Sequence, residues 1–475
     1  MALFAADDKF ADIVAALEAR GWQRLPYVGC PKFDLKWTNY AKIAWKRVTP
    51  GQIVNHLQHS VLFSQKDQLT RLLYTQAARR DGGQNILDKC FPRTFDLSQP
   101  RDQKLLKGWF LYSKALQVLR KSLIEDLAVK SSLETALRLT KAVVNDDNFF
   151  EGWRTEDVVG KLIRTTEAEQ LLTSKSGKMS LDFATRQEVQ GILAKLERRD
   201  PQFQMTGDVS SNVWICKPSN LSQGRGIVLC SSFEELMKIM SPDDKQKLQE
   251  EGNSKPTKWI VQKYIERPLL LQSGRKFDIR QWVLIAELEP KPVAFWFYKS
   301  YLRFCSRKFD LARLQDRFTH LSNYSVQQHF ELSKTEGSSR QEEIVDDFEH
   351  MWSSDTFQDT LRQEHGIDVW GETILPQMQS TARLAIDAVL PHLKAVGRGF
   401  EWLGFDFLVD ESLRVWLLEV NVSPDISHST SVTAEMVPKA TVDALNVILD
   451  SEVLRAPGNG WLPFPLESDH QTVKK

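Results

Sequence analysis

Apolar residues at the spacing of an amphipathic helix dominate the first 200 residues of the chain. Phe10, Ile13 and Leu17 already follow this spacing, which predicts that the N-terminus is a helix of the mature fold. Short aromatic runs at 35–40 and 42–46 predict strands ahead of the longer helical stretches. The polar segment 173–180 predicts an exposed loop, and further helices are expected at 65–77, 103–129, 133–144 and 188–199.

From about residue 211 the pattern changes to apolar runs bounded by Gly, Pro or Asp, which is typical of strands. Strands are expected at 212–216, 258–262, 277–288, 292–304, 400–409 and 413–420, with helices at 233–240, 341–363 and 372–393. Hairpins next to helices favour an α+β or mixed α/β fold over a doubly wound parallel sheet. The pattern divides the chain into an N-terminal α/β domain (1–105), a mostly helical region (106–210), a strand-rich region (211–455) and a tail (456–475).

Composition narrows the class of protein. The chain has 475 residues, with 62 Lys and Arg against 62 Asp and Glu, and 42% of its residues are hydrophobic. The charge balance argues against a polybasic nucleic-acid binder, whose affinity depends on many cations that neutralise phosphates. The 25 Phe, 14 Trp and 8 Tyr can fill a large core, which argues against disorder.

Targeting and redox signals point to the inside of the cell. Asp7 and Asp8 stand where a signal peptide needs a basic region, and no run reaches the roughly 18 apolar residues of a membrane span. The five cysteines are odd in number and include no C-x-x-C pair, so they predict neither a disulfide framework nor a zinc site. We therefore expect a cytoplasmic chain with no nucleic-acid or membrane partner.

The first group with candidate chemistry follows the strand expected at 212–216. Lys217 ends that strand, Pro218 stops it, and a polar loop then carries Arg225 between Gly224 and Gly226. Glycines let backbone N–H groups approach an anion, and the two cations supply charge. The loop is either a phosphate cradle or a surface turn with a solvated Lys, since it matches neither a Walker A loop nor a G-x-G-x-x-G motif.

The second group lies on an aromatic strand. Strand alternation puts Lys276, Asp278 and Arg280 on one face and apolar residues on the other. Three charges on one face of a central strand are costly unless they are paired or meet a ligand. The alternative is the solvated face of an edge strand.

The third group is the strongest metal signal. A two-residue loop at 411–412 would pair Asp406 with Leu417, and alternation would then put Asp406, Glu419 and Asn421 on one face. Three hard oxygen ligands among apolar residues suit Mg²⁺ bound with nucleotide phosphates, whereas a lone buried carboxylate would be expensive.

Two loop residues and two missing motifs complete the candidate chemistry. His320 and Asn323 could reach the site from a loop, or form only a capping turn. The chain has no H-E-x-x-H pair and no G-x-S-x-G elbow, so the sequence does not support hydrolysis by zinc or by a serine triad. Together the three groups describe an ATP·Mg²⁺ site built on strands.

With these residues in view, the sequence resembles the tubulin–tyrosine-ligase-like family, whose catalytic region is an ATP-grasp ligase. The similar stretches are 53–56 (IVNH), Lys66 with Asp67, 214–227, 261–268 (VQKYIERP), 276–280, 320–326, 400–410 and 416–424 (WLLEVNVSP). The resemblance implies an ATP-grasp fold with an N-terminal mixed domain and a helical insertion, in which 211–455 is the catalytic region.

The resemblance also implies roles for single residues. Phosphates would be held by Lys217, Arg225, Gly226 and Ile227, and the adenine pocket would be lined by Gln262, Lys263, Tyr264 and Ile265, with Lys276 and Asp278 near the nucleotide. Mg²⁺ would be bound by Asp406, Glu419 and Asn421, and the catalytic residues would be Arg280, Asn323 and Glu419, with Arg280 and Asn323 facing the donor amino acid or the acyl phosphate.

Within the family the glycylase branch is most similar, in segments such as 91–95 (FPRTF) and 351–354 (MWSS). That branch implies ATP-dependent joining of glycine to glutamate side chains of tubulin tails through an acyl phosphate. It also implies a monomer on the cytoskeleton, in the axoneme of a cilium or flagellum. Three alternatives remain open: a tubulin polyglutamylase, a non-catalytic microtubule-binding protein on this fold, and an ATP-grasp ligase for a small molecule.

Two departures and one charge pattern bear on these alternatives. Gln223 stands where the family commonly has Arg, which removes one phosphate contact, and Ser322 replaces a frequent Thr. Neither change touches the metal-binding residues, so we expect an active enzyme. The segment 266–308 has nine Lys and Arg against four acids, while 341–372 has ten acids and one Arg. The first segment predicts a cationic groove that would steer an acidic tail.

Overall fold

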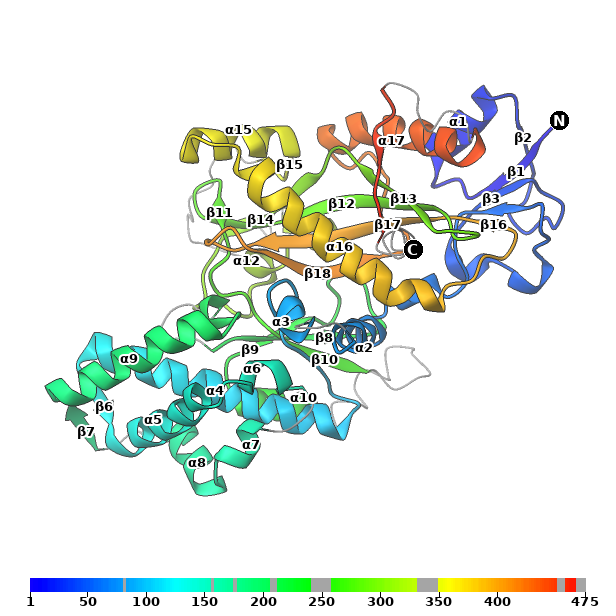
Figure 1. The fold of residues 1–475 in the computed structure, drawn as a ribbon. Coiled ribbons are helices and arrows are strands. Elements are labelled where there is room, and N and C mark those ends of the chain that lie inside the picture. Colours follow the sequence, from blue (N-terminus) through cyan, green and yellow to red (C-terminus); the bar gives the residue numbers. More distant parts are fainter. Residues whose placement is uncertain are drawn as a thin grey trace, which may run out of the picture.

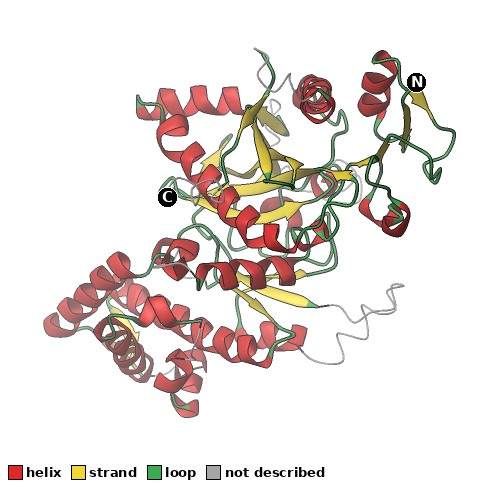
Figure 2. Cartoon of the chain, turned by 45° about the vertical axis from the view of Figure 1, so that its right-hand side comes forward, coloured by secondary structure: helices red, strands yellow, loops and turns green. Residues whose placement is uncertain are grey.

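Four β-sheets organise the chain in the computed structural model, which describes residues 1–79, 83–154, 158–173, 177–205, 212–240, 258–330, 349–450 and 458–466. Helices lie outside the strands (Figure 2). Parallel and antiparallel sheets occur together with helices, which confirms the mixed α/β class expected from the sequence. In the described ranges, no helix combines the length and apolar character needed to cross a membrane.

A parallel sheet forms the N-terminal part of the molecule. Its strands, in spatial order, are β16 (Arg398–Gly399), β4 (Ile53–Val54), β3 (Leu35–Trp37), β1 (Leu3–Ala6) and β2 (Gln23–Arg24). Helix α1 (Ala11–Ala19) makes the crossover that the parallel pair β1 and β2 requires. Ile13 and Leu17 bury this helix in a core shared with α17 (Ser431–Leu449), beside which α1 lies in Figure 1.

Two antiparallel sheets form the centre (Figure 1). The smaller contains, in order, β5 (Thr94–Asp96), β10 (Trp259–Lys263), β8 (Trp214–Pro218) and β9 (Val228–Cys230). The larger is built around β12 (Arg275–Glu287) and contains β11 (Leu270–Leu271), β13 (Val293–Phe297), β14 (Tyr301–Lys308), β15 (Met351–Ser353), β17 (Glu401–Val409), β18 (Val415–Asn421) and β19 (Trp461–Pro463).

Alternation along β17 decides which face of the larger sheet is core and which is free to form a site. Phe405 and Phe407 point to one face, where they share a buried cluster with Met378 and Ile386 of α16 (Leu375–Val389). Burying each such side chain contributes about 1.5–3 kcal/mol. The residues between them, such as Asp406, therefore face the smaller sheet.

A helical region extends from one end of the smaller sheet, at the lower left of Figure 1. It contains α4 (Pro100–Glu125), α5 (Lys130–Asn145), α6 (Phe149–Gly152), α7 (Val158–Leu162), α8 (Thr165–Thr173) and α9 (Phe183–Arg199), with the ribbon of β6 (Leu127–Val129) and β7 (Lys178–Ser180). Pro100 opens α4, where its missing N–H costs nothing. Trp109 of α4 shares one core cluster with Trp214 of β8, so this region packs on the central sheets.

Several expected elements differ from those observed. The expected strand at 42–46 is wrong, because this stretch forms 3₁₀ turns at Tyr40–Lys42 and Trp45–Arg47, which bring the Tyr40 and Trp45 rings together in a tilted contact with centroids 5.3 Å apart. Part of the expected loop at 173–180 is strand β7. The single strand expected at 292–304 is two strands, β13 and β14.

The expected helix at 341–363 falls partly on 341–348, which lie outside the described residues, and its remainder includes strand β15. Helix α17 was not expected, because Pro438 interrupts its pattern. The remaining helices needed below are α2 (Lys66–Ala77), α3 (Gly83–Asp88), α10 (Phe233–Met240), α12 (Arg317–His320), α13 (Tyr324–Gln327) and α15 (Ser354–His365).

Candidate active site

A cavity lies between the two antiparallel sheets. Strands β8 and β10 form one wall, and β12, β17 and β18 form the other. The loop between α12 and α13 closes one side. The lining residues are Pro92, Ile215, Lys217, Ile227, Gln262, Lys263, Tyr264, Ile265, Lys276, Asp278, His320, Leu321, Ser322, Asn323, Asp406, Leu408, Leu418 and Glu419. Most residues singled out in the sequence therefore meet at one place.

Lys217 is the central cation of the first wall. Its Nζ donates to Oε1 of Gln262 at 2.7 Å, and the side chain is buried. Burial lowers the pKa of Lys217 to about 8, an effect that nearby Glu419 opposes and Lys66 reinforces. Lys263, on the neighbouring strand, is instead held by an ion pair with Glu266.

The loop between β8 and β9 contains residues that were expected to hold phosphates, and they do not all lie at the cavity. Gly224 has φ +68°, and a Cβ there would lie 2.9 Å from Cγ2 of Val326, so this position requires glycine. Ile227 reaches the cavity, but Arg225 is exposed and lines a separate surface depression with Arg307 and Arg317. The structure thus does not bring Arg225 to the cavity.

A hydrogen-bond chain positions Lys276 in the second wall. Its Nζ donates to the Tyr264 hydroxyl at 3.0 Å and to the carbonyl of His320 at 2.8 Å. Burial, with a further contribution from nearby Lys276, lowers the pKa of His320 to about 4. The neutral ring can donate from Nε2 to the carbonyl of Arg313 at 3.1 Å and accept from Tyr264 at Nδ1 at 3.0 Å.

Two arginines and two carboxylates form a buried cluster beside Lys276. Arg303 of β14 makes two bonds to Asp278, at 2.7 and 2.6 Å, and a third contact to Asp406 at 2.8 Å. Arg280 binds both oxygens of Asp406. Burial raises the pKa of Asp406, but the two arginines outweigh it and bring the value to about 2.

The pairing of β17 with β18 differs from the expected register. Asp406 lies opposite Glu419, not opposite Leu417, because the loop is longer and a bulge follows Asp406. Leu418 is the extra residue of the bulge. Asp406 and Glu419 still face the cavity together, and Nδ2 of Asn421 lies 3.3 Å from Asp406. The shared face was expected correctly, through the wrong register.

The donor chemistry of this face suits Mg²⁺ held jointly with phosphates, which takes only one or two protein carboxylates. Glu419 is partly exposed to the cavity and contacts Lys66 at 3.6 Å. Among the described side chains, no three His, Cys, Asp or Glu gather as a metal cluster. These residues therefore suit a metal ion whose coordination shell is completed by oxygen atoms of the substrate.

Arg303 is the main functional candidate that the sequence reasoning missed. It lies opposite Asp278 because β14 pairs antiparallel with β12. Treating 292–304 as one strand hid that pairing. The turn at 298–300 contains neither Gly nor Pro, so only the second polar-apolar alternation beginning at Tyr301 could have revealed it.

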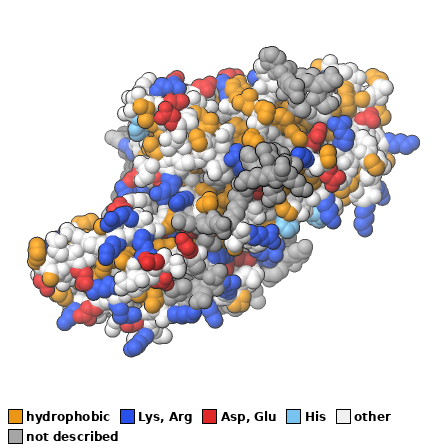
Figure 3. Space-filling model, in the orientation of Figure 1, with side chains coloured by type: hydrophobic (Ala, Val, Ile, Leu, Met, Phe, Trp, Pro, Cys, Tyr) orange, Lys and Arg blue, Asp and Glu red, His pale blue; other side chains and the backbone are white. Residues whose placement is uncertain are grey.

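The expected cationic segment is largely internal. Five of its nine cations form ion pairs within the fold: Arg267 with Glu411, Arg280 and Arg303 with Asp406, Lys299 with Asp355, and Arg307 with Asp316. On the face drawn in Figure 3, Lys and Arg are scattered over the helical region as well as the sheets. These ion pairs offset much of the positive charge from which the sequence predicted a cationic groove.

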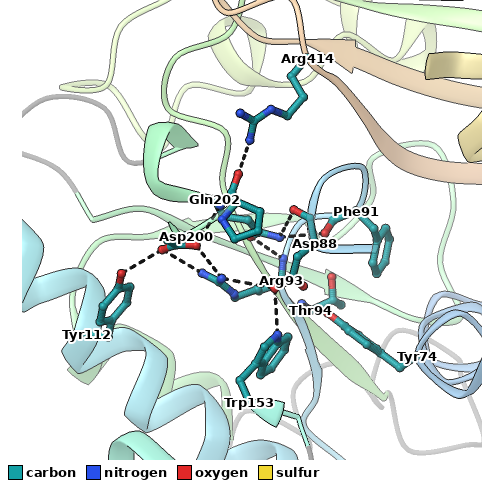
Figure 4. Close-up of polar contacts among 11 residues, drawn as sticks. Tyr74, Asp88, Phe91, Arg93, Thr94, Tyr112, Trp153, Asp200, Gln202 and Arg414 are labelled. Carbon is teal, nitrogen blue, oxygen red and sulfur yellow. Dashed lines mark hydrogen bonds and ion pairs between the residues drawn. The ribbon is translucent and has the colours of Figure 1, made fainter. Parts of the chain in front are cut away.

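A second buried cluster holds the segment that leads into β5 (Figure 4). Arg93 pairs with Asp200 at 2.7 Å and with Asp88 at 3.3 Å, and its guanidinium lies 3.9 Å from the Trp109 ring. Trp153 donates to Asp88 at 2.9 Å. Pro92, beside Arg93, lines the cavity, so the cluster fixes the edge of the site from the helical side.

Comparison with known proteins adds the following findings. The model of the tubulin-tyrosine ligase family matches residues 154–455. A tubulin monoglycylase of Mus musculus is 38% identical over 275 residues, which cover 58% of this chain and 28% of that protein. A tubulin glycylase of Tetrahymena thermophila is 26% identical over 511 residues, covering 93% and 45%. A protein monoglycylase of Mus musculus is 34% identical over 269 residues, covering 56% and 30%. The chain thus spans less than half the length of these relatives.

Proposed function

The chain belongs to the tubulin-tyrosine ligase family, and we propose that it is an ATP-dependent ligase that joins glycine to glutamate side chains of tubulin C-terminal tails. The fold we propose for residues 211–455 is ATP-grasp, in which two antiparallel sheets enclose the nucleotide. The cavity between such sheets in this chain supports that reading.

The observation that carries the proposal is the charge arrangement in one cavity. Buried cations, Lys217 and Lys276, line it together with two carboxylates, Asp406 and Glu419. Lys217 and Lys276 donate to neutral groups, so their buried charge is costly until an anionic ligand meets it, and the two carboxylates suit a metal bound with that ligand. ATP·Mg²⁺ carries both.

We assign the roles accordingly. Lys217 and Lys276 would bind phosphates, and the backbone and side chains of 262–265 would surround the base. Asp406, Glu419 and Asn421 would hold Mg²⁺, which offsets charge on phosphate oxygens when bound. Arg280 supports Asp406, and Asn323 stands at the cavity wall where the amino acid would enter.

The reaction proposed at this site has two displacements. A glutamate carboxylate oxygen of the tail attacks the γ-phosphorus of ATP, and ADP leaves. The glycine amine then attacks the acyl carbon, phosphate leaves, and the amine loses one proton. Charge grows on the departing ADP in the first step, and on the acyl oxygen and the departing phosphate in the second. Preorganised Lys217 and Lys276 would stabilise the charge on the phosphates without reorganisation.

Glycine as the donor and tubulin as the acceptor rest on the names of similar proteins, two of which are tubulin glycylases or monoglycylases. We extend this to an association with the cytoskeleton, in cilia or flagella. A family member that transfers glutamate instead is the alternative, because the charge arrangement of the cavity suits either amino acid.

The test uses the full chain with tubulin, ATP, Mg²⁺ and either glycine or glutamate, followed by mass spectrometry of the tails. We expect glycine to be added and glutamate not. If only glutamate is added, glycine is the wrong donor but the proposal that the protein is a ligase stands. Tubulin binding without ADP release would instead favour a non-catalytic microtubule-binding protein.

A further inference from the structure

Three hydrogen bonds link Lys217 to a strand that the catalytic proposal does not use. Lys217 Nζ donates to Gln262 Oε1 at 2.7 Å, Gln262 Nε2 donates to Thr94 Oγ1 at 2.8 Å, and Thr94 Oγ1 donates to the carbonyl of Pro92 at 2.6 Å. Lys217, Gln262 and Thr94 are all buried. The chain of bonds therefore crosses three strands, β8, β10 and β5, away from solvent.

The direction of every bond in this chain is forced. A charged Lys can only donate, so the amide oxygen of Gln262 must face Lys217. The amide nitrogen of Gln262 then faces Thr94, whose hydroxyl must accept. The single hydroxyl proton of Thr94 consequently goes to the Pro92 carbonyl. Reading from Pro92 gives the same result, because a carbonyl can only accept.

Strand pairing places these groups in line. Thr94 lies directly opposite Gln262, while Lys217 lies opposite Ile260, two residues along the same face. The backbone of Thr94 is itself clamped: its N–H donates to the Tyr74 hydroxyl at 3.2 Å, and its carbonyl accepts from Arg154 at 2.8 Å. The position of the Thr94 hydroxyl group is therefore fixed.

The turn before Thr94 is held just as firmly. Gln202 accepts from the N–H of Arg93 at 3.0 Å and donates to the carbonyl of Phe91 at 3.0 Å, as part of the cluster in Figure 4. The carbonyl of Arg93 accepts from the N–H of Lys263 at 2.9 Å. The helical region thus fixes the place from which Thr94 acts on the cavity.

We propose that Thr94 is a positioning residue: it fixes the amide of Gln262 so that the amide oxygen holds the Lys217 ammonium where it meets the nucleotide phosphates. This inference rests on the proposed function, because it takes ATP as the ligand of Lys217. Without the Thr94 hydroxyl, the Gln262 amide can rotate and the ammonium loses a fixed acceptor.

The test measures the Kd for ATP·Mg²⁺ by calorimetry on the full chain, with no acceptor present. Thr94→Val keeps the shape and removes the hydroxyl, and we expect about tenfold weaker binding, the size of one lost charged hydrogen bond. Thr94→Ser should restore binding. In turnover, the KM for ATP should rise more than kcat falls, whereas loss of folded protein alone would lower kcat and leave KM unchanged.

The matched control is Thr140→Val. Thr140 is also fully buried and donates to a backbone carbonyl, that of Ala136 at 2.7 Å, but it lies in α5 within the helical region. Its variant should keep the wild-type Kd. Thr94→Ala is measured beside Thr94→Val, so that the result does not depend on how Val is accommodated.

A double-mutant cycle with Lys217→Met separates the possible failures. If Thr94 acts through Lys217, Thr94→Val should weaken ATP binding no further in the Lys217→Met background. Additive losses would overturn the positioning role, as would an unchanged Kd in Thr94→Val alone. If Lys217→Met itself leaves the Kd unchanged, the proposed nucleotide site is wrong, which is a different outcome.

Discussion

Two buried arginine–carboxylate clusters in this molecule share their chemistry and differ in their surroundings. The first joins Arg280 and Arg303 to Asp278 and Asp406 at the wall of the cavity. The second joins Arg93 alone to Asp88 and Asp200, under aromatic rings (Figure 4). We call them the cavity cluster and the closed cluster.

The pKa of an aspartate is shifted in opposite directions in the two clusters. Burial raises the pKa of both Asp406 and Asp88. Two arginines overcome it at Asp406 and bring the value to about 2, whereas at Asp88 a single arginine, shared with Asp200, leaves the value at about 6. The balance of charges within a cluster, and not burial alone, decides which carboxylate stays ionised. An ionised carboxylate at a cavity wall can meet a metal.

The largest expected effect is a loss of stability when the closed cluster is broken. Asp200→Ala in the closed cluster removes the main partner of Arg93 and the acceptor of the Tyr112 hydroxyl at 3.0 Å. Losing one partner of a buried ion pair costs about 3–5 kcal/mol. Denaturant unfolding should show that loss in the free energy of unfolding. A loss below about 1 kcal/mol would mean that the closed cluster does not hold the fold.

The next effect separates the clusters by activity. Glu419→Gln, beside the cavity cluster, should reduce ligation by about 10²–10³-fold, because it removes a carboxylate that would hold the Mg²⁺ ion against the reacting phosphate. The melting temperature should stay near that of the wild type, since Glu419 is partly exposed. The control is Glu411→Gln, whose carboxylate pairs with Arg267 away from the cavity. Retained ligation in Glu419→Gln would refute the metal role.

The smallest effect tests the charge balance itself. Because the folded pKa of Asp88 is about 6, above the ordinary aspartate value of 3.8, the folded state holds the extra proton between these values. Wild-type stability from this group should therefore fall as pH rises from about 4 to 6 and stay level above. Asp88→Asn should lose that slope in unfolding measured against pH. At pH 7 it should not show the loss expected of Asp200→Ala, because Asn buries no charge and still offers an acceptor to Trp153.

Strand alternation predicted much of the site from the sequence. It placed Lys276 and Asp278 on one face of β12, and Asp406 and Glu419 on one face of the hairpin, and all four side chains line the cavity. The register could not be predicted, because the bulge at Leu418 has no Gly or other local marker. The face expected from alternation is still correct here, despite the bulge, only because Glu419 lies on the cavity side of the bulge.

The closed cluster could not be predicted in the same way. Asp88 and Arg93 lie five residues apart, but Asp200 lies 107 residues beyond Arg93, and each alone is an ordinary charged residue in the sequence. Asp88 ends α3 and Asp200 follows α9, and their ion pairs with Arg93 join both segments to the turn before β5. Helical spacing predicts that those helices exist, but not which loops they cover.

The N-terminal sheet can be completed only after strand β16 has been synthesised. Its residues, Arg398 and Gly399, pair with Ile53 and Val54 of β4. At ~5–20 residues per second, a ribosome needs roughly 20–70 s to travel from one strand to the other. During that time β4 remains an open edge, which is a template for wrong pairing. In a nascent chain of this protein, that edge of the first sheet therefore stays unpaired until residues 398–399 have been synthesised.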